Sequence, residues 1–399
     1  MPIKTIIVIA GLALGASACS AQSVSAVTSA SIKTKDARNT TVVESTRQNI
    51  AEQNLVGDDL FTERDLRQEV DSQRIQDFVL TSGNNSEIKE EGIYRLSGSY
   101  QNTSLVINAG DRDKIQLVLD GLEITNQNQP AIYVKSADKV WVTTSEKNSD
   151  LKVTGDYTPD GDTNLDAVIF SRSDLVLNGT GFLNIQSNEG NGISTKDDLK
   201  ITGGSFVIQA AEDGLEANDS IRIHDGNIRI DAGEDGLHSE NDEDLTLGYI
   251  FIRGGNITIN SGDDGIRGNS QITIAGGSIT IPQSKEGIEA THILIEDGSI
   301  DIYATDDGIN ATRKGAGTVA IRVTGGSIAI SMANGDTDAF DSNGDLFISG
   351  GTIDVTARSA FDADGQSSLT GGTVRVNGSP VTSLSQGGFR GGKRKSPRR

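Results

Sequence analysis

Residues 212–215 read Glu-Asp-Gly-Leu, and residues 234–237 repeat the same four letters. Residues 263–266 and 306–309 read Asp-Asp-Gly-Ile, and residues 285–288 give a weaker copy, Lys-Glu-Gly-Ile. The shorter intervals between copies are 21 or 22 residues, while longer intervals indicate loops extruded from single repeats. A fixed period of this length predicts a solenoid, in which each repeat buries its apolar face against its neighbours.

Each repeat alternates apolar and polar residues over three short runs. Ile221 and Ile223 are expected to face inwards with Arg222 facing out between them, and Ile228 and Ile230 repeat the alternation. Pairs of glycines between the runs suit tight corners. The sequence therefore predicts an all-β fold, a right-handed single-stranded parallel β-helix with three short strands per coil and about ten to twelve coils.

The composition of the chain suits a narrow core and excludes some classes of partner. The 399 residues include 47 glycines, 6 prolines and few aromatic residues, and glycine keeps no three-residue period, which excludes collagen. The formal net charge is −21. An acidic body of this kind does not bind nucleic acid through phosphates and favours metal cations or basic partners. We expect a monomer.

The first residues are typical of an export signal. Lys4 precedes a short apolar run at residues 6–14, and small residues at 15–18 lead to Cys19, the single cysteine of the chain. A cysteine in this place resembles a bacterial lipobox, so we predict cleavage before Cys19 and lipidation of its thiol. An ordinary signal peptide with an incidental cysteine is the alternative.

The chain divides into four predicted segments. Residues 1–18 are the signal peptide, and residues 19–57 are rich in small polar residues and predict a flexible tether. Residues 58–385 are the predicted β-helix domain, with one short helix expected near 63–78. Residues 386–399 form a basic, Gly-rich tail that is expected to be disordered. We expect a secreted, membrane-anchored lipoprotein at the cell surface or outer membrane.

The acids of the repeat form columns when the coils stack. Neighbouring acids at strand spacing repel each other by about 3 kcal/mol per pair at an effective dielectric of 20, and bound cations relieve that repulsion. Clustered carboxylates with backbone carbonyls suit Ca²⁺, which takes oxygen ligands. The alternative is that these residues are solvated Asp-Gly turns. The predicted calcium ligands are Glu212, Asp213, Glu234, Asp235, Asp263, Asp264, Asp306, Asp307 and Asp338.

A second column is formed by the residue two positions after the glycine of each repeat copy. It is expected to face outwards. It forms a polar ladder that can hydrogen-bond a chain of sugars laid along the axis, and long insertions near residues 239–248 and 313–318 are expected to frame it. Its predicted carbohydrate-binding residues are Glu216, His238, Arg267, Glu289 and Asn310. Arg267 suits a uronate carboxylate. The alternative for Arg267 is a surface ion pair with Glu289.

Four runs of the chain, at residues 115–126, 130–140, 190–204 and 234–243, resemble the bacterial carbohydrate-binding domain-containing family of parallel β-helices. The resemblance covers roughly residues 58–380. It implies an extracellular, calcium-bound β-helix, similar in shape to pectate lyases of the family-9 type, that binds plant or acidic polysaccharide. It also implies calcium ligands on the Asp-Asp-Gly and Glu-Asp-Gly copies, from which the copy at Lys285 departs.

The leading functional prediction is a calcium-stabilised polysaccharide-binding lipoprotein. The first alternative is a polysaccharide lyase that acts on uronate polymers by β-elimination, with Arg267 or Lys196 as the base. The second alternative is a structural or adhesive surface protein without a soluble ligand. No histidine-based catalytic constellation can be assembled from the three histidines of the chain.

Overall fold

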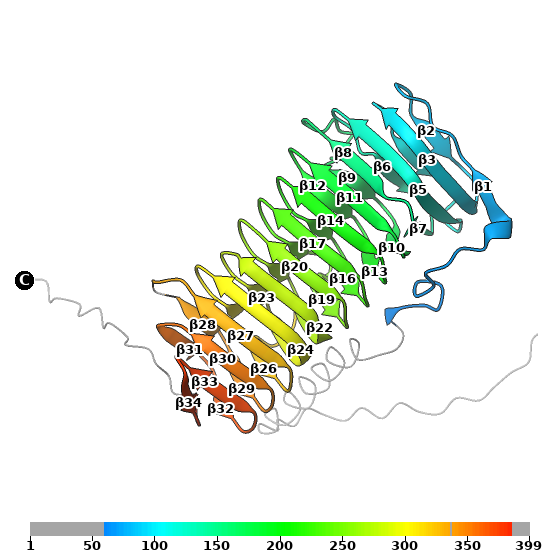
Figure 1. Ribbon diagram of the computed structural model, residues 1–399. Coiled ribbons are helices and arrows are strands. Elements are labelled where there is room, and N and C mark those ends of the chain that lie inside the picture. The colour runs from blue at the N-terminus through cyan, green and yellow to red at the C-terminus, as the bar shows by residue number, and fades with distance from the viewer. Residues whose placement is uncertain (1–59, 336, 385–399) are drawn as a thin grey trace, which may run out of the picture. The chain divides into compact units, whose positions relative to one another are not determined.

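The computed structural model describes residues 60–335 and 337–384. Over this range the chain winds into a parallel β-helix whose coils follow one another in chain order (Figure 1). The predicted all-β, parallel fold is confirmed. The signal peptide, Cys19, the tether and the tail at 386–399 lie outside the described residues, so the predictions about them stay predictions.

One side of each coil contributes to a 12-stranded sheet, here called the narrow sheet. Neighbouring strands in it pair in parallel, and most are three to five residues long. Its strands, in order, are β2 (Ser86–Ile88), β4 (Leu105–Asn108), β6 (Ile132–Ser136), β9 (Ala167–Ser171), β12 (Asn191–Thr195), β15 (Leu215–Ala217), β18 (Leu237–Ser239), β21 (Ile266–Gly268), β23 (Ile288–Ala290), β25 (Ile309–Ala311), β28 (Asp338–Ser342) and β31 (Ser359–Ala363).

The other two sides of each coil join into a 22-stranded sheet, here called the wide sheet. Its first row holds β1 (Ile75–Asp77), β7 (Lys139–Thr144), β10 (Asp174–Gly179), β13 (Asp198–Ile201), β16 (Ser220–Ile223), β19 (Tyr249–Ile252), β26 (Ala320–Val323), β29 (Asp345–Ile348) and β32 (Ser367–Leu369). Its second row holds β8 (Ser149–Val153), β11 (Phe182–Ser187), β14 (Ser205–Ala210), β17 (Asn227–Ala232), β20 (Asn256–Asn260), β27 (Ser327–Met332), β30 (Thr352–Thr356) and β33 (Thr373–Val376).

Four long strands run through both rows, so these coils do not show the three separate strands that the sequence predicted. They are β3 (Gly92–Gln101), β5 (Lys114–Asn126), β22 (Gln271–Gln283) and β24 (His292–Ala304). At the C-terminal end, β34 (Ser379–Val381) turns back and pairs antiparallel with β33. This pairing covers the edge of β33, the last strand of the second row.

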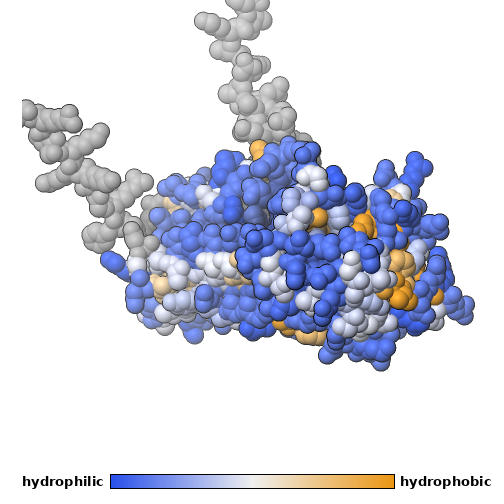
Figure 2. Space-filling model, turned by 90° about the horizontal axis from the view of Figure 1, so that it is seen from above, coloured by the Kyte–Doolittle hydropathy of each residue, from blue (hydrophilic) through white to orange (hydrophobic). Residues whose placement is uncertain are grey.

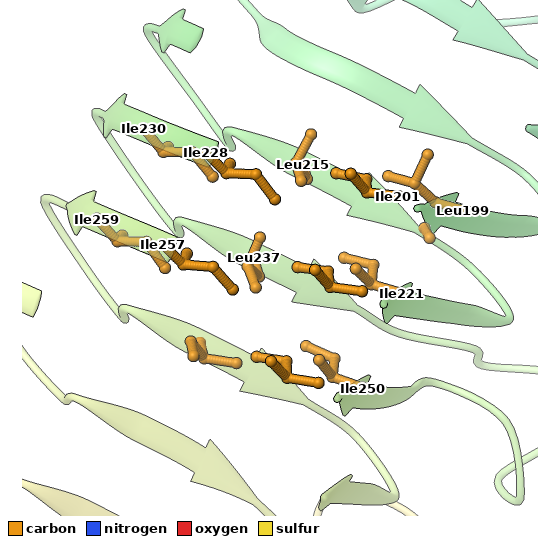
Figure 3. Packing of buried hydrophobic residues seen from close by; sticks show 14 of the residues in the cluster. Leu199, Ile201, Leu215, Ile221, Ile228, Ile230, Leu237, Ile250, Ile257 and Ile259 are labelled. Atoms are coloured by element: carbon orange, nitrogen blue, oxygen red, sulfur yellow. The ribbon is translucent and has the colours of Figure 1, made fainter. Parts of the chain in front are cut away.

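Aliphatic side chains stack from coil to coil along the interior. Ile221 pairs in register with Ile250, and Ile250 pairs with Ile272, and all three are fully buried. Figure 3 shows the same rows of side chains pointing into the coil, among them Ile228 above Ile257. Truncation of one such isoleucine to alanine costs about 2–5 kcal/mol, because the rigid stack cannot close the cavity.

The glycine of the acidic repeat is required by close contact between coils. A Cβ placed on Gly236 would lie 2.2 Å from Cγ2 of Ile259 and 2.5 Å from the carbonyl oxygen of Gly265. Gly236 does not have the positive φ that usually explains a glycine. The acid-Gly-aliphatic signature therefore marks the place where one coil packs against the next.

The segment before the first strand differs from the sequence prediction. Instead of a helix near residues 63–78, the described chain has a 3₁₀ turn, Ser72–Arg74, and an irregular segment at residues 60–68 with a turn at residues 63–66. That segment, here called the strap, lies across the wide sheet. Its polar groups bond both to the sheet and within its own turn, where the backbone N–H of Leu66 donates to the carbonyl of Thr62. Among the described residues, no helix has the length and apolar character that a membrane-crossing segment needs.

Candidate functional site

The outward column of the narrow sheet lies where the sequence predicted it. Glu216 pairs in register with His238, His238 with Arg267, Arg267 with Glu289, and Glu289 with Asn310. Each is the middle residue of a three-residue strand whose flanking residues are buried. Because strand residues alternate sides, burial of the flanking residues holds the middle side chain on the outer face.

The inner acids of the repeat form a hydrogen-bonded ladder beside this column. Oδ1 of Asp213 accepts the backbone N–H of Asp235 at 2.8 Å, and Oδ1 of Asp235 accepts that of Asp264 at 2.8 Å. Asn191 begins the ladder, since its Oδ1 accepts the N–H of Asp213 at 2.8 Å. An amide oxygen therefore serves this role as well as a carboxylate, and the charge of the later members is an additional feature.

The ladder breaks in the coil of Lys285. Oδ1 of Asp264 is buried and lacks a hydrogen-bond partner among the described residues, in the coil where Glu286 stands in place of the next aspartate. Glu286 instead accepts a hydrogen bond from Nδ2 of Asn310 at 3.0 Å. The ladder resumes where Oδ1 of Asp307 accepts the backbone N–H of Asp338 at 3.0 Å.

The outer acids of the repeat are less buried than the inner ones. Glu234 and Asp306 are exposed, whereas Glu212 and Asp263 are partly buried. Asp263 binds Lys285, whose Nζ lies 3.1 Å from its Oδ1. Asp263 stays close to the inner acids, because a carboxylate oxygen of Asp263 lies within 4.8 Å of oxygens of Asp235 and Asp264. The outer acids are therefore less buried than the inner ones, but they are not all remote from them.

His238 is a fixed cation within the acidic column. Its Nδ1 lies 2.7 Å from Oδ2 of Asp213 and its Nε2 lies 3.0 Å from Oε2 of Glu240. Burial opposes the charge, but the hydrogen bond to Asp213 and the carboxylates of Asp213 and Asp235 outweigh it and raise the pKa of His238 to about 9. At neutral pH both ring nitrogens carry a proton, so this histidine offers no lone pair to a metal ion.

Arg267 lies among three carboxylates rather than in one surface pair. Its guanidinium lies 3.4 Å from Oδ2 of Asp235, 3.7 Å from Oε2 of Glu240 and 3.9 Å from Oε2 of Glu289. Nζ of Lys314 lies 2.5 Å from Oε2 of Glu289. Glu240 and Lys314 are not among the residues predicted from the sequence, although both lie in the insertions near 239–248 and 313–318 that were expected to frame this surface.

Three carboxylates gather at the break in the ladder, and Asp264, Glu286 and Glu289 are here called the carboxylate cluster. Each offers an oxygen, and these oxygens lie within 4.8 Å of one another. Burial and the neighbouring Glu286 raise the pKa of Asp264 to about 9. Burial and Glu289 raise the pKa of Glu286 to about 8. Without a cation the cluster therefore retains protons at neutral pH.

The carboxylate cluster fits an oxygen-binding cation better than the neighbouring group that contains His238. Oδ1 of Asn310 is also buried without a hydrogen-bond partner in the described part of the chain, so it adds a neutral oxygen beside Glu286. The group of Asp213, Asp235 and His238 is less suitable because His238 is a cation. Three carboxylates and an amide oxygen are ligands that Ca²⁺ prefers.

The C-terminal acids are close in sequence to this cluster but are not part of it. Burial raises the pKa of Asp307 to about 6 and that of Asp341 to about 7, and neighbouring acids add to both shifts. Asp338 accepts a hydrogen bond from the hydroxyl of Ser359. Asp306 is exposed.

Loops border the outward column at both ends. The loop at 154–166 covers the first aromatic residues of the narrow sheet, and the hydroxyl of Tyr133 donates to Asp160 at 3.1 Å. Further along, the insertions at 240–248 and 312–319 meet, because the N–H of Ala316 donates to the carbonyl of Leu245 at 2.7 Å. The view in Figure 2 is mostly hydrophilic, with apolar side chains confined to small patches. The column itself consists of polar and charged side chains.

Lys196 and Arg267, the two bases considered for a lyase, lie apart. Lys196 follows β12 and Arg267 lies on β21, with β15 and β18 between them. Lys196 lies 3.6 Å from a carboxylate oxygen of Glu216. The two residues cannot act on the same atom.

Residues 82–339 match the model of the family described as carbohydrate-binding domain-containing protein. The chain belongs to this family. The matched range contains the ladder, the outward column and the carboxylate cluster. The family predicted from residues 115–126, 130–140, 190–204 and 234–243 is thus confirmed.

The chain is similar to two known proteins. A carbohydrate-binding domain-containing protein of Acetivibrio thermocellus (strain ATCC 27405) is 34% identical over 127 residues, which cover 31% of this chain and 44% of the relative. The chain thus matches less than half the length of that relative. A solved structure, described as the polysaccharide lyase-like protein from C. thermocellum in a gadolinium derivative, is 32% identical with a TM-score of 0.52. The match covers 57% of this chain and 95% of that one, and it supports the β-helical fold.

Proposed function

We propose that the chain binds polysaccharide along the outward column of the narrow sheet and holds Ca²⁺ at the carboxylate cluster. Membership of the carbohydrate-binding family and the likeness to a polysaccharide lyase-like protein support the polysaccharide. The observation that carries the proposal is the buried, unpartnered Oδ1 of Asp264 beside Glu286 and Glu289 within the described chain. Export and anchoring through Cys19 remain sequence predictions.

Repulsion among the carboxylates of the cluster favours a bound cation. Two carboxylates of the cluster that both ionise at separations up to 4.8 Å repel each other by about 3 kcal/mol or more at an effective dielectric of 20. A divalent ion converts this repulsion into attraction. Ca²⁺ takes six to eight oxygens, so part of its coordination shell is left for water or for a sugar carboxylate.

Calcium and an acidic sugar chain would support each other's binding. Lys314 and Arg267 neutralise Glu289 in the structure. When Glu289 turns to Ca²⁺, these two cations become available to a carboxylate of the sugar chain. A polymer laid along the helix axis crosses several coils and meets the borders formed by the insertions. Calcium, Lys314 and Arg267 together favour an acidic polysaccharide that binds in a calcium-dependent manner.

The same geometry argues against Arg267 as the base of a lyase. Burial lowers the pKa of Arg267, but Asp235, Glu240 and Glu289 outweigh it, and the pKa is raised above its ordinary value. A base that abstracts a proton must be unprotonated, whereas this guanidinium stays charged. Arg267 is suited to holding a carboxylate.

Calorimetric titration with polygalacturonate tests the proposal. We expect binding with calcium that is lost with chelator, and Lys314→Ala should weaken it about tenfold, equivalent to about 1.4 kcal/mol. Lys147→Ala is the matched control, because Lys147 pairs with Asp120 away from the narrow sheet and should leave the affinity unchanged.

Two results would contradict the proposal. Calcium binding without affinity for polygalacturonate, alginate or cellulose would leave a structural surface protein. Steady release of unsaturated uronide products that stops in Arg267→Ala would instead identify a lyase.

A further inference from the structure

The strap lies on the outer face of the wide sheet. The outward column lies on a different sheet, the narrow sheet. It forms no β-ladder with the strands beneath it. Gln68 donates to the carbonyl of Thr202 at 2.9 Å and accepts the N–H of Gly179 at 2.8 Å. Asn178 donates to the carbonyl of Arg67 at 3.1 Å. Polar contacts thus hold most of the strap in place.

At the centre of the strap, the carboxylate of Asp65 is completely buried. Its Oδ1 accepts the indole N–H of Trp141 at 3.1 Å, and its Oδ2 accepts the backbone N–H of Thr62 at 3.0 Å. Nζ of Lys200 lies 3.6 Å away and Nζ of Lys139 lies 3.9 Å away. Both lysine distances exceed hydrogen-bond length, so the two ammonium groups attract the carboxylate by charge without a direct hydrogen bond.

The charges around Asp65 leave one cation dependent on it. Lys139 also pairs with Asp174 at 3.0 Å, and Arg222 pairs with Asp198 at 2.8 Å. Among the ion pairs of the described residues, Lys200 has only Asp65. If the strap leaves, Lys200 becomes an unpaired cation on the face of the sheet.

An aromatic face lies next to this cation. Trp141, Val176, Lys200, Arg222 and Phe251 follow one another in register on the outer face of the first row. The guanidinium carbon of the strap's Arg64 lies 3.8 Å from the centroid of the Trp141 ring. The strap therefore places a flat group on an indole face and a carboxylate between two lysines. A carboxylated sugar ring satisfies the same two requirements by stacking and by ion pairing.

We propose that the sheet face beneath the strap is a second binding surface, which takes a chain of carboxylated sugars, and that Asp65 occupies its anion position as an internal competitor. The sugar chain displaces the central strap and pairs with Lys200 and Lys139. The proposal does not rest on the calcium site, because none of these residues belongs to the carboxylate cluster.

The balance of forces makes such an exchange feasible. The apolar anchors of the strap, Leu60 and Phe61, lie at its start, where Phe61 contacts His224 and Phe251. Over Trp141 the strap contributes charged and polar groups, and Leu66 is partly exposed. A buried ion pair gives little net stability once desolvation is counted, so a ligand that supplies the same charge replaces it at low cost.

Trp141 is the single tryptophan of the chain, so its fluorescence reports directly on this surface. The experiment titrates galacturonate oligomers into the full chain with chelator present, which removes the calcium-dependent site from the measurement. In Asp65→Asn we expect red-shifted emission, more quenching by acrylamide and an affinity at least about tenfold tighter than in the wild type. Addition of Lys200→Gln to that variant should abolish the gain.

The controls separate this proposal from a purely structural strap. Asp77→Asn removes a carboxylate from an exposed ion pair with Arg95 and should change nothing. Unchanged affinity in a folded Asp65→Asn variant would overturn the proposal. If Asp65→Asn does not fold, Arg64→Ala takes its place, since it uncovers the indole and leaves Asp65 intact. Absence of any oligomer-induced change in its Trp141 fluorescence would overturn the proposal equally. If oligomers do not bind beneath the strap but calcium-dependent binding persists, the second surface is overturned. The proposal for the narrow sheet is then unaffected.

Discussion

At the residue scale, the inner acids of the repeat combine two roles in one carboxyl group. In Asp213 and Asp235, Oδ1 accepts the backbone N–H of the next coil, while Oδ2 faces the cations of the outward column. Asn191 shows that the first role needs only an oxygen. The second role needs charge, and it is satisfied by His238 and Arg267 in two coils. At Asp264 neither cation is in hydrogen-bond contact, and this is where the proposed metal site lies.

His238 should give the folded protein a measurable dependence on pH. Its folded pKa of about 9 lies above the ordinary value near 6.5, so its pairing stabilises the fold fully below pH about 6.5. That stability is lost as the pH rises through about 9. Chemical unfolding with saturating calcium should show His238→Gln destabilised by about 1–3 kcal/mol at pH 6 and much less at pH 10.

The groups that face His238 set the control for this measurement. They are Asp213, Asp235, Glu240 and the cation Arg267. His224 lies on the wide sheet beside Phe61, and burial lowers its pKa, so His224→Gln should not reproduce the effect. An equal destabilisation of His238→Gln at both pH values would contradict a charged His238.

At the element scale, the short strands of the narrow sheet are defined by contact between coils. Each acidic copy ends in a glycine that has no room for a side chain, followed by an aliphatic residue that enters the core. This combination places the acid beside the sheet and the residue after the aliphatic on its outer face. The geometry of the candidate site therefore follows from packing of the coils.

Gly236→Ala should destabilise the fold although alanine is a small residue. The added carbon would meet Ile259 and the carbonyl of Gly265 at 2.2 and 2.5 Å, and overpacking of this kind costs about 1–3 kcal/mol or more. Gly161 has open space around it but a φ of +60°, so Gly161→Ala should cost only about 1 kcal/mol, from backbone strain. Thermal unfolding compares the two variants, and equal melting temperatures would contradict the crowded contact.

At the scale of the whole molecule, the period of the acidic copies was sufficient to predict the parallel β-helix and the outward column. Those features depend on residues close in sequence, whose alternation is strict. The strap was not predictable, because it has no period and Arg222 reaches Leu60 across a separation of 162 residues. The difference in burial between inner and outer acids was not predictable either, because it depends on how the coils stack. The copy at Lys285 is the weakest match to the acidic repeat. Its neighbour Glu286 nevertheless completes the carboxylate cluster.

The most direct test of the central claim is calorimetric titration of calcium near pH 7.5 in two buffers with different ionisation enthalpies. Because Asp264 and Glu286 have pKa values of about 9 and 8, calcium should displace protons, and the apparent enthalpy should differ between the buffers. Glu286→Gln should lose at least about tenfold in affinity, while Glu234→Gln at an outer acid should bind as the wild type does. Wild-type protein that binds no calcium, or Glu286→Gln protein that binds it with unchanged affinity and proton release, would contradict the account.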